Sequence, residues 1–117
     1  MTYAYSNEVL RLKEKLPKFL QITIGRRLFE LSLTCADQIV VANSTEEKLP
    51  HMKVAGLSIE RSWMLIRMLH DNKGISRGEM QGVSERLSDI SKQLTAWMKW
   101  ERERLKQKDG AKPVPAK

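Results

Sequence analysis

The sequence predicts an all-α protein, an up-down-up-down four-helix bundle over residues 1–105 followed by a disordered basic tail over residues 106–117. The first observation behind this is the scarcity of helix breakers, because the 117 residues include only four prolines and six glycines. The second is that apolar residues recur at intervals of three and four, which is the period of an α-helix. Because the connections between these periodic stretches are short, neighbouring helices are expected to run antiparallel.

The first two helices are separated by Pro17. A short helix is expected from about Asn7 to Lys15, with Ser6 or Asn7 as its N-cap, and Pro17 prevents it from continuing. The second helix is expected from about Leu20 to Ala42, closed by Asn43 in a left-handed conformation. Beside its main apolar stripe it carries a second one, formed by Phe29, Leu33, Ala36 and Val40. An apolar surface this wide indicates burial on two sides, in the bundle and against another subunit.

The third helix has two alternative starts. Ser44 and Glu47 have the spacing of a capping box, whereas Pro50 favours a regular helix that begins at the proline. The three-four apolar pattern continues to about residue 72, and Gly74 is expected to end the helix. Trp63 lies on the flank of the apolar stripe, a position where an aromatic side chain is typical of an interface.

The fourth helix has the clearest periodic pattern. Ser76 and Glu79 form a capping box, and the helix is expected to continue to about Leu105. Its unbroken apolar stripe consists of Met80, Val83, Leu87, Ile90, Leu94 and Trp97. Trp100 lies beyond this seam, where it either covers the end of the bundle or anchors an interface.

Positive charge is the main compositional signal. The net charge of +7 and the isoelectric point of about 9.8 favour anionic partners over simple solubility. Two basic regions are candidate nucleic-acid contacts, one formed by Arg11, Lys15, Lys18, Arg26 and Arg27, the other by Lys99, Arg102, Arg104, Lys106 and Lys108. Phosphate neutralisation by these side chains predicts salt-sensitive binding without base readout. Glu101 and Glu103 interleave with the second region, which is also typical of a solvated helix end.

The sequence contains no recognisable catalytic or metal-binding motif, so we expect a protein that is not an enzyme and needs no cofactor. Cys35 is the only cysteine and lies on an apolar stripe, which predicts a buried thiol and excludes an intramolecular disulfide. His51 and His70 lack the spacing of a zinc site. Some bundle ribonucleases use an arginine and a histidine four to six residues apart, which Arg67 and His70 do not match. His70 is expected to contact Asp71 instead.

The sequence also lacks targeting signals. The N-terminus does not combine basic residues with a following apolar stretch, as a secretory signal would. No segment approaches 18 uncharged apolar residues, so no transmembrane helix is expected. We therefore expect a cytoplasmic protein.

Four motifs suggest a family. They are Glu14-Lys15-Leu16-Pro17-Lys18 followed by Ile24-Gly25-Arg26-Arg27-Leu28; Ala55-Gly56-Leu57-Ser58-Ile59-Glu60; Leu65-Ile66-Arg67-Met68-Leu69-His70-Asp71-Asn72-Lys73; and Leu87-Ser88-Asp89-Ile90 with Leu94-Thr95-Ala96-Trp97-Met98-Lys99. Over roughly residues 9–100 the chain resembles the accessory variability determinant proteins of diversity-generating retroelements. These belong to a four-helix-bundle family that includes the intervening-sequence proteins of bacterial 23S ribosomal RNA genes. The chain departs from the family pattern at Trp63, which replaces an arginine, and at Thr95-Ala96, which replaces two glycines.

The resemblance implies a specific role. Members of the family are positively charged homopentameric barrels that bind a reverse transcriptase and its RNA, and support the synthesis of mutagenised cDNA without being catalytic. On this interpretation the basic side chains contact RNA, cDNA or an RNA–DNA hybrid, and Trp63 with Arg67 forms the contact with the polymerase. Two alternatives are an intervening-sequence-type bundle protein of unknown role and a bundle ribonuclease. A neighbouring reverse transcriptase gene would favour the first interpretation.

Overall fold

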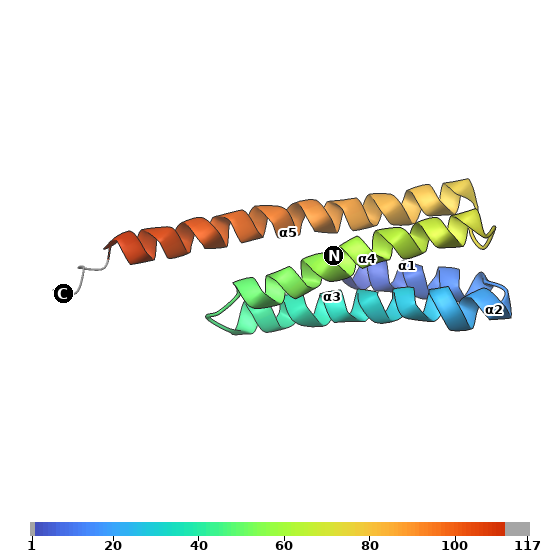
Figure 1. Ribbon diagram of the computed structural model, residues 1–117, viewed down its shortest axis with the longest axis horizontal. Coiled ribbons are helices and arrows are strands. Elements are labelled where there is room, and N and C mark those ends of the chain that lie inside the picture. The colour runs from blue at the N-terminus through green and yellow to red at the C-terminus, as the bar shows by residue number, and fades with distance from the viewer. Residues whose placement is uncertain (1, 112–117) are drawn as a thin grey trace.

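The computed structural model describes residues 2–111, with side chains described for residues 2–108. Its elements are α1 (Thr2–Lys15), α2 (Lys18–Leu20), η1 (Gln21–Gly25), α3 (Arg26–Ser44), α4 (Leu49–Asp71) and α5 (Arg77–Ala111). Elements α2, η1 and α3 follow one another without a break and form one long helix (Figure 1). The described residues contain no β-strand, so the predicted all-α class is confirmed.

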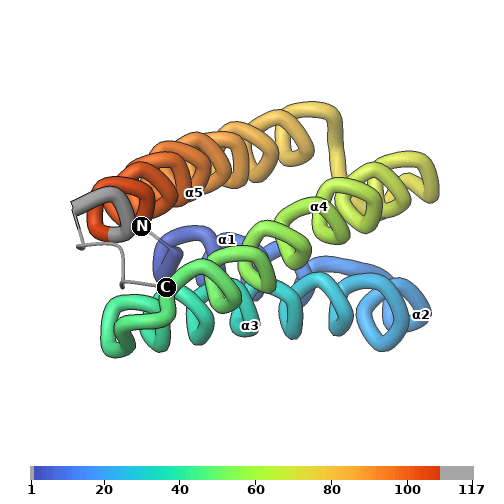
Figure 2. The backbone as a smooth tube through the Cα atoms, turned by 60° about the vertical axis from the view of Figure 1, so that its left-hand side comes forward, coloured from blue at the N-terminus to red at the C-terminus, as the bar shows by residue number. Residues whose placement is uncertain are grey.

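The four long helices enclose one core. α3 packs against α1 and α4, and α5 packs against α4 and α1, as the tube view shows (Figure 2). The fully buried side chains include Leu28 of α3, Met52 and Ile66 of α4 and Leu87 of α5. Cys35 lies among them, as predicted, and its burial raises the pKa of the thiol to about 11.

Helix α1 begins at Thr2, so the predicted start at Asn7 is wrong. Tyr5 lies four residues before Val9, and both side chains are about 1% exposed, so the apolar stripe extends one turn further toward the N-terminus than expected. Ser6 is buried within this turn and does not cap the helix, because its hydroxyl has no hydrogen-bond partner among the described residues. Burial of the Tyr5 ring therefore determines where the helix starts, in preference to a polar cap.

Pro17 ends α1 as predicted, and the next helix begins immediately after it. The chain turns there into a π-helical segment, η1, whose last residue is Gly25. A Cβ on Gly25 would lie 2.7 Å from Leu16 Cδ1, so the glycine permits this close contact between the two helices. Helix α3 then continues to Ser44, and Asn43 is helical within it, so the predicted left-handed end at Asn43 is wrong.

The capping box predicted at Ser44 and Glu47 is also wrong. Ser44 remains helical, and its hydroxyl donates a hydrogen bond to the Val40 carbonyl, 3.0 Å away, on its own helix. Helix α4 begins at Leu49 with Pro50 in its first turn, which confirms the alternative start.

Helix α4 ends at the expected place, but the residue with the left-handed backbone conformation is Lys73 and not Gly74. Lys73 has φ of 60°, and it is the one non-glycine residue with positive φ in the described part of the chain. The Gly74 amide donates to the Leu69 carbonyl at 2.7 Å, which together with the Lys73 conformation closes the helix end. The capping box at Ser76 and Glu79 is confirmed, because each backbone amide donates to the other residue's side-chain oxygen, at 2.9 and 3.0 Å.

Helix α5 is longer than predicted, since it runs to Ala111 and passes the expected end at Leu105. It therefore extends into the segment that we expected to be a disordered tail, and residues 112–117 lie outside the described residues. Its end projects past the loop between α3 and α4 (Figure 1). Trp97 is half-buried against the core, whereas Trp100 is 56% exposed.

Candidate nucleic-acid interface

The first basic region surrounds the turn between α1 and α3. Lys15 ends α1, Lys18 begins the helix that follows, and Arg26 and Arg27 open α3. Their side chains are all exposed, whereas Leu16 and Leu20, which lie between them in the sequence, are buried in the core. Arg11 is also exposed, one turn earlier on α1. The structure thus keeps the five predicted residues of this region together at one part of the molecule.

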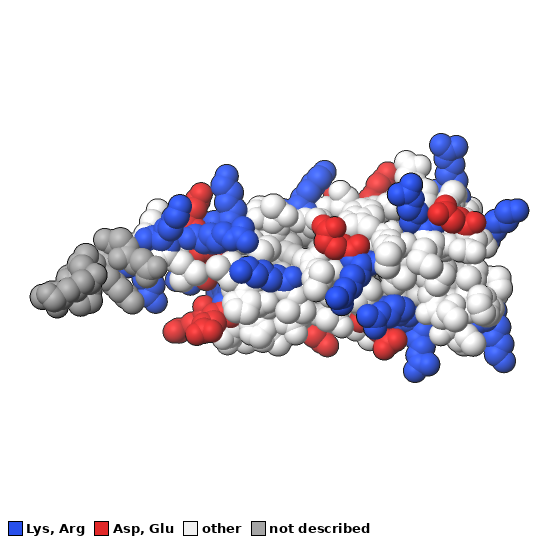
Figure 3. Space-filling model, in the orientation of Figure 1, with Lys and Arg blue, Asp and Glu red and all other residues white. Residues whose placement is uncertain are grey.

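A second turn, residues 72–76, packs against this first turn. A Cβ on Gly74 would lie 2.8 Å from Leu20 Cδ1 and 3.0 Å from Leu16 Cδ2, so the turns are in direct contact. Their contact places Lys73 and Arg77 at the same end of the bundle as the first region. Blue side chains gather there on the face shown in Figure 3. We call Lys15, Lys18, Arg26, Arg27, Lys73 and Arg77 together the basic end.

Lys73 and Arg77 were not among the predicted contacts. Sequence clustering misses them because they lie more than 45 positions beyond Arg27. The expected antiparallel order of helices did contain the signal, since the first and third connections of such a bundle lie at the same end. Cations near both connections of such a bundle therefore belong to one surface.

The cations of the basic end are largely free of partners within the molecule. Arg26 Nε lies 3.9 Å from Glu30 Oε1, and both side chains are well exposed, so this pair contributes little. No ion pair within the described side chains involves the other five cations. The nearby Glu79 carboxylate already accepts a hydrogen bond from the Ser76 amide. The basic end can therefore offer several positive groups to an anionic partner.

The second basic region lies near the other end of the molecule, on the last turns of α5, and one of its members is already occupied. Arg104 forms two hydrogen bonds to the Glu101 carboxylate, at 3.0 and 2.7 Å. Glu101 has no exposed surface, and the hydrogen bonds from Arg104 lower the pKa of its carboxyl. Lys99 and Arg102 remain exposed. The predicted contact at Arg104 thus has a structural role in this fold.

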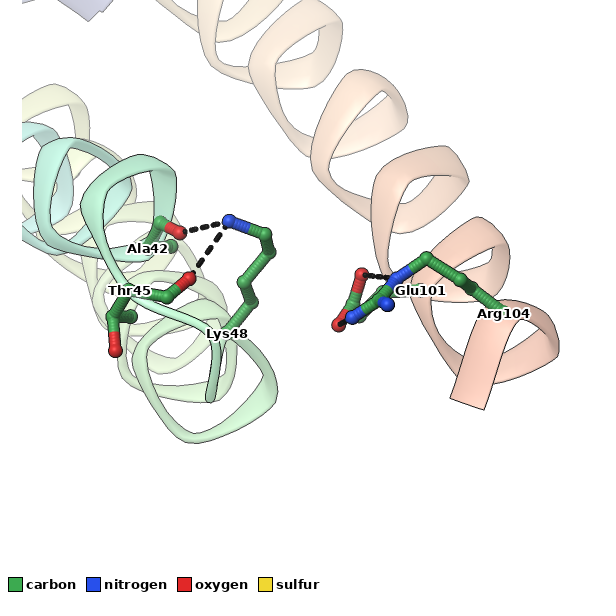
Figure 4. Close-up of polar contacts among 5 residues, drawn as sticks. All are labelled: Ala42, Thr45, Lys48, Glu101 and Arg104. Atoms are coloured by element: carbon green, nitrogen blue, oxygen red, sulfur yellow. Dashed lines mark hydrogen bonds and ion pairs between the residues drawn. The ribbon is translucent and has the colours of Figure 1, made fainter. Parts of the chain in front are cut away.

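The loop between α3 and α4 faces this ion pair. The Lys48 amine donates hydrogen bonds to the carbonyls of Ala42 and Thr45, both at 2.8 Å (Figure 4). These carbonyls close the C-terminal end of α3, where backbone oxygens lack helical partners. Lys48 also lies near enough to Glu101 to favour its charged form. Hydrogen bonds and ion pairs thus fix the loop between α3 and α4 and the nearby turns of α5. The whole molecule is 64 Å long along its longest axis.

Trp63 and Arg67, the predicted polymerase contacts, lie one turn apart on α4. Trp63 is half-buried and lines a shallow hollow of about 420 Å³ together with Arg77 and Ser84 of α5. Arg67 is exposed. The structure therefore places an aromatic edge and two guanidinium groups along the junction of α4 and α5.

The histidines have structural neighbours. His51 Nδ1 lies 2.8 Å from Gln38 Oε1, which ties α4 to α3. His70 Nδ1 lies 3.8 Å from Asp71 Oδ1, the contact expected from the sequence. Within the described residues, no three His, Cys, Asp or Glu side chains gather as a metal site would require.

None of the described helices has an apolar stretch long enough to cross a membrane. Comparisons with protein-family models, with curated proteins and with solved structures found no match.

Proposed function

We propose that this protein is a non-catalytic accessory protein of a diversity-generating retroelement, which binds the reverse transcriptase and its template RNA or cDNA. The observation that carries the proposal is the basic end, where two packed turns present six exposed cations. The family resemblance supplies the identity of the partners. In the proposal the protein acts in the cytoplasm as a homo-oligomer, pentameric in the family, with the up-down-up-down connectivity that short loops favour.

Nucleic acid would be held by its phosphates. Exposed lysines and arginines release counterions when they neutralise phosphates, which gives binding that is strong at low salt and indifferent to sequence. In a ring each basic end is repeated in every subunit, so modest contacts add through multivalency. This suits a protein that must follow a template of changing sequence.

The polymerase would be held elsewhere, at the junction of α4 and α5. Tryptophan and arginine are the residues that most often dominate protein interfaces, because they combine a large contact area with directional hydrogen bonds. Trp63 is half-buried, so its ring is already ordered, and Arg67 is exposed beside it. A partner surface could cover both without unfolding the bundle.

The proposal is tested by co-purification with a reverse transcriptase, where one is encoded beside the gene for this protein. We expect the wild-type protein to retain the polymerase. Arg67→Ala should lower the retained amount at least severalfold, because one central arginine contributes about 1 kcal/mol or more to the binding free energy of an interface. Lys92→Ala is the matched control, since Lys92 is also an exposed helical cation. Circular dichroism should show both variants folded. Failure of the wild-type protein to bind the polymerase would refute the function.

A further inference from the structure

A hollow of about 500 Å³ opens beside the basic end, between the last turn of α1 and the long helix that follows it. Its apolar wall is formed by Ile22, Phe29 and Leu33, and it is also lined by Arg26, one of the cations of the basic end. Phe29 is half-buried and packs against the core, so its ring is already ordered. We call this space the Phe29 hollow. It joins an aromatic surface to the cations that we propose to hold phosphates.

The π-helical segment η1 supplies part of the wall of the Phe29 hollow. The Arg26 amide donates a hydrogen bond to the Gln21 carbonyl, five residues earlier, as π-helical geometry requires. Across this wider turn Leu20 and Gly25 are both buried, whereas Gln21 and Ile22 border the hollow. Single π-helical turns occur frequently at functional sites. The one π-helical segment among the described residues therefore lies where we place a binding site.

Charges of both signs border the Phe29 hollow. Lys13 and Arg26 are positive and Glu30 is negative, and Arg26 Nε lies 3.9 Å from Glu30 Oε1. The Glu30 carboxylate repels a phosphate that enters the hollow. Outside it, Lys18 and Arg27 have no ion-pair partner among the described side chains. A phosphate is therefore held better by the basic end, and a neutral group with apolar faces and a polar edge fits better in the hollow.

Single-stranded RNA combines these two kinds of group. Proteins bind single strands by pairing a positively charged surface, which holds the backbone, with aromatic side chains on which bases stack. Phe19 supplies a second ring at this place, because it directly follows Lys18 and is 73% exposed. In a duplex the faces of the bases are covered by their neighbours, so only an unpaired strand can use such rings. Aromatic side chains beside unpaired cations therefore favour a single strand over a duplex.

We propose that the Phe29 hollow takes a base of single-stranded RNA, stacked on the Phe29 ring, while the adjoining phosphates lie against Arg26 and the other cations of the basic end. The Gln21 amide borders the hollow and can donate to or accept from the edge of the base. Stacking does not select a sequence, because every base has an aromatic face. The inference rests on the proposed binding of nucleic acid, and it adds that the strand is single and that its bases are contacted.

Fluorescence anisotropy tests this site with a short single-stranded RNA, the abasic strand of the same length and the matching RNA duplex. The wild-type protein should bind the single strand about fivefold or more tightly than the abasic strand, which corresponds to about 1 kcal/mol or more for a stacked base. Phe29→Leu, which keeps an apolar side chain, should abolish this preference and leave the duplex affinity and the salt dependence unchanged. Phe29→Tyr keeps the ring and should retain the preference. Tyr3→Leu is the matched control, since Tyr3 is an exposed aromatic residue outside the hollow.

Three results would overturn the proposal. The first is equal binding of the normal and abasic strands by the wild-type protein, a comparison that needs no variant and is decisive even if Phe29→Leu unfolds. The second is a full preference for bases in a Phe29→Leu protein that circular dichroism shows to be helical. The third is a Phe29→Leu protein that loses the polymerase and keeps its RNA affinity, because the hollow would then hold protein.

These outcomes separate the base site from the proposed function. If both strands bind equally and their affinity falls steeply with salt, the phosphate contacts of the proposed function stand and only the base site is wrong. If neither strand binds even at low salt, the nucleic-acid part of the proposed function is wrong as well. Polymerase co-purification decides the remaining part of that function independently.

Discussion

The two basic regions differ in how the fold uses their charges. At the basic end, the cations lie over two turns that pack against each other through Leu16, Leu20 and Gly74, and most of them have no ion-pair partner. On the last turns of α5, Arg104 is bonded to Glu101, and the cations alternate with acids along a single helix. The comparison teaches that a count of lysines and arginines does not define a binding surface. Packing decides which of them are gathered and left free.

The strongest test of this difference is nucleic-acid binding at each end. Lys73→Ala with Arg77→Ala should reduce the dependence of log affinity on log salt for single-stranded RNA by about 1.4, since two phosphate contacts are lost. Lys99→Ala with Arg102→Ala should change it by less than half as much, because acidic neighbours already offset these charges. Both slopes of log affinity against log salt can be measured by fluorescence anisotropy at salt concentrations from about 50 to about 200 mM. Equal reductions would show that the two ends bind alike.

A second test separates packing from charge at the basic end. Gly74→Ala should destabilise the protein by about 1–3 kcal/mol, because the new Cβ would meet Leu20 Cδ1 and the Leu69 carbonyl at 2.8 and 3.2 Å. Gly82→Ala is the matched control, with no atom within 4 Å of its added Cβ, and should stabilise by about 0.5–1 kcal/mol. Thermal unfolding followed by circular dichroism measures both. A neutral Gly74→Ala would mean that the two turns are not in tight contact.

The smallest effect is expected from the ion pair on α5. Hydrogen bonds from Arg104 lower the pKa of the Glu101 carboxyl in the folded state. The charged carboxylate therefore stabilises the folded state above the unfolded pKa of about 4.3. This stabilisation is lost as the pH falls through the lower folded pKa. Glu101→Gln should therefore lower the thermal midpoint slightly near neutral pH, and by progressively less as the pH falls below the unfolded pKa of about 4.3. A difference that persists in acid would assign the loss to packing.

Local sequence signals predicted the fold well where the local interaction was also the strongest one. The capping box at Ser76 and Glu79 formed as expected, because the preceding turn breaks the helix and frees the Ser76 side chain. The same pattern at Ser44 failed, because α3 continues through that serine and Lys48 satisfies the carbonyls at the end of α3. The start of α1 was missed because burial of Tyr5, a tertiary interaction, extends the helix. Tertiary packing is what local patterns cannot supply.

The candidate site was predicted in part for a related reason. Lysines and arginines near Pro17 cluster in the sequence, so they were found, whereas Lys73 and Arg77 join them only through the contact between two turns. The occupation of Arg104 also depends on geometry, because an i, i+3 spacing to Glu101 permits an ion pair without requiring one. Only the folded structure therefore shows which cations lie together and which are already paired.

The length of α5 has a consequence for any assembly of side-by-side copies. The helix outlasts its neighbours at one end only, the end opposite the basic turns (Figure 1). Copies related by rotation about an axis parallel to the bundle all point the same way. Such an assembly would have two unlike rims, one formed by the basic ends and one formed by the projecting ends of α5. It would therefore be directional, and a nucleic-acid strand bound along its axis would meet a different surface at each end.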